Sequence, residues 1–312
     1  MTFSFTSLAE TVRAGAPLSP EDVLSARRWA WGDGAISAQE AETIFELNRL
    51  AGTPTPEWAD FFVEAMTAYV VNRLAPRGYV DEANADWLIE RIDRDGRVDT
   101  MAELELIVKV LETALGVPAV LKAYALRQIE AAVLTGEGPT RRGAGLVPGS
   151  VGEVDVALLR RLIFAAGGDG ATIVSRDEAE MLWRLKEATL GAANAPGWQT
   201  LFVQALGNHL TAHSSYRPLD RCEAARLEAF VADAGGGVGA FLGRMARSNP
   251  AAGFRAVFGR KTAPAGRAAD EAAAAAVTAD EAAWLEGRIT ADGARDPLEE
   301  ALLAFLEEES GR

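Results

Sequence analysis

Two histidines and a cysteine have the residue types and the spacing of a metal site. His209 and His213 are four residues apart, so a helix through them places both imidazoles on one face. Cys222 follows, and imidazole and thiolate groups of this kind bind Zn²⁺ or another transition metal. No glutamate adjoins His209, as it would in an HExxH motif. These residues are candidate zinc ligands, but we favour the alternative, an ordinary helix-surface position for His209.

Nucleophilic catalysis has little support in the sequence. Cys222 is the only cysteine, and it can meet a histidine only if the chain between 209 and 222 folds back on itself. The motifs GxSxG and GxxxxGK[ST] are not present, and GGGVG at 235–239 has no following lysine. We therefore expect a non-catalytic protein. An enzyme with a site between two halves of the chain is the alternative.

A basic, aromatic segment is the clearest candidate for a contact surface. Between Ala234 and Ala269 there are six basic residues and no acidic residue, interleaved with three phenylalanines. This composition suits an acidic protein partner or the surface of an anionic membrane. An internal contact with the acidic residues 270–312 is the alternative that we favour. The predicted partner-binding residues are Arg244, Arg247, Phe254, Arg255, Phe258, Arg260 and Lys261.

The elements that carry these residues recur along the chain. Asp-Gly occurs at 33–34, 95–96, 169–170 and 292–293, between amphipathic stretches. Before it, an apolar residue and a helix-capping residue mark a helix start near 18–20, 80–81, 154–155 and 277–278. After it, capping boxes mark second helices at Ser37…Glu40, Ser175…Glu178 and Asp296…Glu299, and prolines at 56, 118, 196 and 250 open third helices.

The repeating unit predicts an all-α fold built from tandem helical units: helix, Asp-Gly turn, helix, proline-started helix. Segments 80–103 and 277–300 align without a gap, which matches Trp87 with Trp284 and Glu103 with Glu300. We expect a first helical half at 1–137, a linker at 138–152, a second half at 153–262, a linker at 263–276 and a terminal half-unit at 277–312. No segment alternates as a strand would.

The turns resemble the later half of an EF-hand loop, through the pattern Asp-Gly-x-[Ile/Val]-[Ser/Asp] followed by glutamate. They also look like the turns of TerB-like tellurite-resistance helical domains. The EF-hand resemblance implies Ca²⁺ ligands at Asp93, Asp95, Asp99 and Glu103. Arg91 stands where the first ligand belongs, and Ala102 where the last does. We therefore favour a structural role, in which the aspartate and glycine form the turn and the next residue caps a helix.

Composition limits the remaining function classes. The net charge is -14, from 45 acidic and 31 basic residues, so the field of the protein repels nucleic acids. The single cysteine suits a reducing compartment, and the sequence has neither a secretory leader pattern nor an apolar span. We expect a cytoplasmic protein that binds another protein, in a metal or stress response. A sensor of calcium or zinc is the alternative within the binding class.

Overall fold

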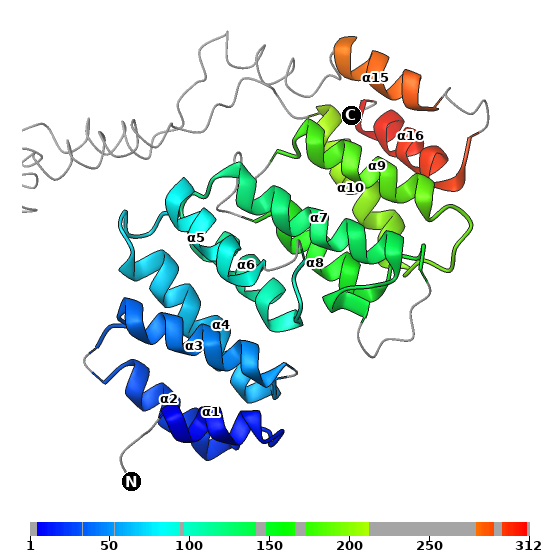
Figure 1. Cartoon of the computed structure of the whole chain (residues 1–312). Helices are drawn as coiled ribbons and strands as arrows, with labels where there is room; N and C mark the ends of the chain where they lie inside the picture. Colours follow the sequence, from blue (N-terminus) through cyan, green and yellow to red (C-terminus); the bar gives the residue numbers. More distant parts are fainter. Residues whose placement is uncertain are drawn as a thin grey trace, which may run out of the picture. The chain divides into compact units, whose positions relative to one another are not determined.

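The structure is a computed structural model that describes residues 5–32, 34–52, 54–93, 97–141, 148–165, 173–211, 279–289 and 295–310. Every regular element within these ranges is a helix (Figure 1). The only β-type pairing there is a single bridge between Tyr79 and Gly116. The predicted all-α fold class is confirmed. No helix in the described ranges is both long enough and apolar enough to cross a bilayer.

The helices follow one another with short connections. In chain order they are α1 (Phe5–Arg13), α2 (Pro20–Ala30), α3 (Ala38–Ala51), α4 (Pro56–Thr67), the π-helix η1 (Ala68–Arg73), α5 (Glu82–Ile92), α6 (Met101–Thr113), α7 (Ala119–Thr135), the 3₁₀-helix η2 (Pro139–Arg141), α8 (Glu153–Ile163), α9 (Arg176–Ala188), α10 (Gly197–Thr211), α15 (Ala279–Ile289) and α16 (Pro297–Ser310). The chain divides into two compact units, residues 1–209 with 289–312 and residues 210–288.

Helix starts follow local cap chemistry. The predicted capping boxes at the starts of α3, α9 and α16 are present, and each joins a backbone N–H at the cap to a glutamate carboxylate. A further box, missed in the sequence, starts α6, where Glu103 accepts from the Thr100 N–H at 2.9 Å. By cap geometry, Glu103 therefore corresponds to Glu299 rather than to Glu300. The gap-free alignment is wrong at this last pair, because the connection before α16 is one residue shorter.

Other predicted starts have mixed outcomes. Ser19 caps α2 and Asp81 caps α5, as expected. The expected cap at Asp155 is wrong by three residues, because Gly152 caps α8 and the helix begins at Glu153. Asp155 instead lies in the first turn of the helix. Its carboxylate accepts a hydrogen bond from the backbone N–H of Gly152 at 2.8 Å, a group that has no partner within the helix. Pro56 opens α4 and Pro118 caps α7, as the proline pattern predicted.

Within residues 1–209, consecutive helices form a layered array. α4 packs on α2, α3 and α6; α6 packs also on α7 and α8; and α7 packs on α5, α8 and α9 (Figure 1). Large aromatic side chains fill the spaces between the helices, and Trp58, Trp183 and Trp198 are the largest that are fully buried. The stacking places α6 between α4 and α7. Grooves between neighbouring layers therefore recur along the array.

Candidate functional site: a groove between α7 and α9

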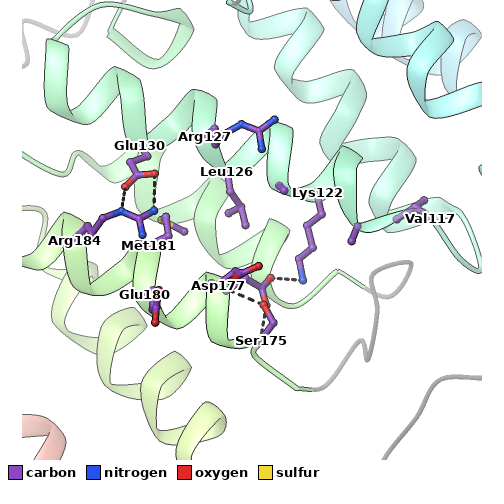
Figure 2. Close-up of a pocket in the computed structure, with 13 residues that line it drawn as sticks. Val117, Lys122, Leu126, Arg127, Glu130, Ser175, Asp177, Glu180, Met181 and Arg184 are labelled. Atoms are coloured by element: carbon purple, nitrogen blue, oxygen red, sulfur yellow. Dashed lines mark hydrogen bonds and ion pairs between the residues drawn. The ribbon is translucent and has the colours of Figure 1, made fainter. Parts of the chain in front are cut away.

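A groove lies between α7 and α9, and its volume is about 390 Å³. Ala119 and Ala123 of α7 and Met181 of α9 line it, and the small alanine side chains leave room between the helices. Figure 2 shows the lining side chains converging from both helices. The full lining is Val117, Ala119, Lys122, Ala123, Leu126, Arg127, Glu130, Ser175, Asp177, Glu178, Glu180, Met181 and Arg184.

A buried ion pair forms part of the floor of the groove. The Lys122 ammonium lies 2.5 Å from Oε1 of Glu178, and these side chains are only 10% and 6% exposed. Lys122 also donates to the carbonyl oxygen of Ile163 at 3.2 Å. The other oxygen of Glu178 accepts the Ser175 N–H at 2.7 Å in the capping box of α9. The contacts of both charged groups fix them in place, as a buried pair requires.

Charged side chains form the rims. Arg184 donates two hydrogen bonds to Glu130, at 2.7 and 3.0 Å, and this pair bridges α9 to α7 (Figure 2). The hydrogen bonds with Glu130 raise the pKa of the Arg184 guanidinium above its ordinary value. Arg127 on α7 and Asp177 on α9 form no salt bridge with any residue in the described ranges. The groove therefore has an apolar wall, and charged groups of both signs line its rims.

The predicted calcium ligands are only partly described. Glu103 is 7% exposed and holds the cap of α6, and Asn48 of α3 donates to it at 3.4 Å. Burial raises the pKa of the Glu103 carboxyl, more than its hydrogen bonds with Thr100 lower it. Asp99 and Glu103 line one small pocket of about 210 Å³. In the described part of the chain, no three acidic, histidine or cysteine side chains gather as a metal site would require.

Asp93 and Asp95 have different outcomes. Asp93 caps the C-terminus of α5 and lies beside Tyr124 of α7. Burial, and next the negative charge of Asp93, raise the pKa of the Tyr124 hydroxyl far above its ordinary value. Asp95, with the glycine of its turn, lies outside the described residues. The four predicted ligands therefore remain a prediction as a set.

The predicted zinc ligands are described at one position only. His209 is 9% exposed in α10, and its Nδ1 lies 2.8 Å from the carbonyl oxygen of Val174. A carbonyl oxygen can only accept, so Nδ1 carries the hydrogen, and Nε2 is the nitrogen through which this side chain could bind a metal ion. His213 and Cys222 lie outside the described residues. So do all seven predicted partner-binding residues between 244 and 261.

Sequence reasoning missed the groove between α7 and α9. One available signal was Lys122, the only charged residue in the apolar run PAVLKAYAL, which opens α7. An isolated lysine in such a run needs a buried acidic partner or a route to solvent. Its partner Glu178 was recognised as a capping residue, but the capping role did not indicate that its second oxygen was engaged by another helix.

Comparisons with known proteins give no further assignment. No protein-family model matches the chain, and no curated protein or solved structure was found to be similar to it. The resemblances to TerB-like domains and to EF-hand loops therefore stay predictions. The function has to be argued from the groove itself.

Proposed function

We propose that this protein acts by binding another protein, and that the groove between α7 and α9 receives an apolar side chain of that partner. The observation that carries the proposal is the groove of about 390 Å³, with Ala123, Leu126 and Met181 on its walls and charges of both signs at its rims. An apolar anchor inside a polar rim is the usual anatomy of a protein interface.

The state of the ionisable groups favours binding over catalysis. Lys122 contacts both Glu178 and a backbone carbonyl, and Glu178 also holds the start of α9. A general acid or base has to exchange a proton with a substrate, and here that exchange would break the ion pair and the cap together. The same contacts suit a rigid receptor, because a preorganised site orders little on binding.

The free energy gained by burying one anchor side chain shows how many further contacts the interface needs. Burying one leucine-sized or phenylalanine-sized side chain contributes about 1.5–3 kcal/mol. One anchor therefore supports only weak association, and additional contacts around the groove have to supply the rest. Arg127 and Asp177 can supply them, because a partner can place an acid against the first and a base against the second.

Site-specific photo-crosslinking in the native cell tests this proposal. A photo-reactive phenylalanine derivative replaces Arg127 on the exposed rim, where it leaves the groove open, or Ala131 on an exposed part of the same helix. We expect a discrete protein adduct from position 127 and none of the same mass from position 131. Equal adducts from both positions, or no adduct from position 127, would contradict the proposal.

A further inference from the structure

A second groove lies one layer earlier in the array, between α4 with η1 on one side and α6 on the other. Its volume is about 600 Å³, and Val63 and Met101 contribute apolar surface to it. One end is formed by Ala68 and Asn72 of the π-helix, and such irregular turns occur frequently at functional sites. The lining is Ala59, Asp60, Val63, Glu64, Thr67, Ala68, Asn72, Met101, Ala102, Glu105, Lys109 and Thr113.

On the α6 and α9 sides, the two grooves use the same helix positions. The capping boxes align α6 with α9, because Glu103 and Glu178 are the box glutamates of the two helices. Two residues further on, Glu105 lines one groove and Glu180 the other. Six residues after each box glutamate, a basic residue lines the groove: Lys109 between α4 and α6, and Arg184 between α7 and α9.

The other sides also correspond. Asp60 lies four residues after Pro56, and Lys122 lies four residues after Pro118, and each lines its groove. One turn later, Glu64 and Leu126 hold the matching positions. Several lining positions therefore correspond on both sides of the two grooves. The groove is a recurring feature of the array, as binding surfaces of repeat proteins are.

In both grooves, acidic side chains outnumber basic ones. Together they are lined by seven acidic side chains and four basic ones, beside alanine, valine, leucine and methionine. Several acids are already paired with arginines, as Glu64 is with Arg27 and Glu105 with Arg161. Asp60 and Asp177, in contrast, form no salt bridge with any residue in the described ranges. The surface therefore complements a segment that is apolar and more basic than acidic.

We propose that a single basic, amphipathic segment of the partner occupies both grooves at once; this inference rests on the proposed function. α6 packs against both α4 and α7, and packed helix axes lie about 8–10 Å apart, so the grooves are separated by roughly 20 Å in the direction across the helix axes. A segment covers that distance with about six extended residues or about 13 helical ones. Two weak contacts on one segment reinforce each other through their effective concentration.

Three matched variants of the full chain test the inference. Ala59→Arg fills the groove between α4 and α6, and Ala123→Arg fills the groove between α7 and α9. Ala131→Arg makes the same change at an exposed site on α7 that lines neither groove. The probes are 16-residue peptides enriched on the wild-type chain from a random display library, with binding measured by fluorescence anisotropy. Thermal unfolding checks that each variant remains folded.

We expect enriched peptides that are rich in arginine, lysine and apolar residues. Ala59→Arg and Ala123→Arg should each weaken binding more than tenfold, Ala131→Arg less than twofold, and added salt should weaken binding to the wild type. Sensitivity to Ala123→Arg alone would overturn the two-groove inference and leave the proposed function standing. Insensitivity to both groove variants would overturn both. Groove-dependent binding of a 241–261 peptide, without library enrichment, would assign the grooves to this chain's own basic segment and overturn the partner assignment.

Discussion

Lys186 of α9 and Glu299 of α16 form an ion pair that is almost completely removed from solvent, although 113 residues separate them in the sequence. Their side chains are 3% and 1% exposed, and Asp296 is a second partner for the same ammonium group, at 2.6 Å. Burial alone would lower the pKa of Lys186, but the hydrogen bonds to the two acids together outweigh it and raise that pKa above its ordinary value. This contact attaches the C-terminal helix to the array.

Replacing Lys186 by methionine should therefore destabilise the protein strongly. Methionine fills a similar volume but leaves Asp296 and Glu299 buried without their cation, and such a loss costs about 3–5 kcal/mol. Urea unfolding followed by circular dichroism measures the difference. The control is Lys109→Met, at a side chain that is 51% exposed and lies 3.8 Å from Glu112, where the expected change is below about 1 kcal/mol. Equal losses in the two variants would show that α16 is not held by this pair.

The Glu103→Gln variant should change how stability depends on pH. Burial raises the folded-state pKa of Glu103, so the folded chain holds its proton more tightly than the unfolded chain does. The stabilisation from this raised pKa is fully present below the ordinary value of 4.5 and is lost as the pH rises through the raised value. The neutral glutamine keeps a capping oxygen and avoids this loss. Its stability relative to wild type should rise from pH 4 to pH 7, and a constant difference would contradict the assigned cause.

Metal removal should leave the thermal stability unchanged. Glu103 is committed to the α6 cap and to Asn48, and within the described residues no three potential ligand side chains gather. A metal bound at 100 times its dissociation constant adds about 2.7 kcal/mol to the folded state, so its loss would be easily detected. The measurement is differential scanning calorimetry with chelator, and then with added calcium or zinc. A chelator-dependent fall in melting temperature that Asp99→Asn abolishes would support the metal-sensor alternative.

The helical fold was predictable from local signals, whereas the candidate site was not. Ser175 followed by Glu178 identifies the start of α9, because the box depends on residues three apart. The burial of the box glutamates could not be deduced in the same way. Their partners belong to other layers of the array: Asn48 for Glu103, Lys122 for Glu178 and Lys186 for Glu299.

These partners also explain why the sequence repeat looked imperfect. Asn48 and Lys186 both lie eight residues after the box glutamate of their own helix, Glu40 in α3 and Glu178 in α9. The corresponding residue of α6 is Leu111, which is apolar. The polar contact with Glu178 is therefore made by Lys122 of α7. The contact recurs at each junction while the residue that makes it changes. A sequence comparison alone does not register this exchange.

Gly207→Ala is a test in which the sign of the effect is informative. Alanine is normally better than glycine inside a helix by about 1 kcal/mol. In α10, however, a Cβ at Gly207 would overlap the ring of Phe305 in α16, and such overpacking costs about 1–3 kcal/mol, so we expect a net loss of up to about 2 kcal/mol.

The matched control is Gly287→Ala in α15, where a Cβ would meet no atom within 4 Å and where stability should not fall. In the Phe305→Ala background, Gly207→Ala should cost less than it does in the wild type, because the smaller side chain makes room for the new methyl group. Urea unfolding of wild type, the three single variants and the double variant measures these differences. A stabilising Gly207→Ala would show that Phe305 does not pack closely against Gly207. The close packing of α16 on α10 would then be contradicted.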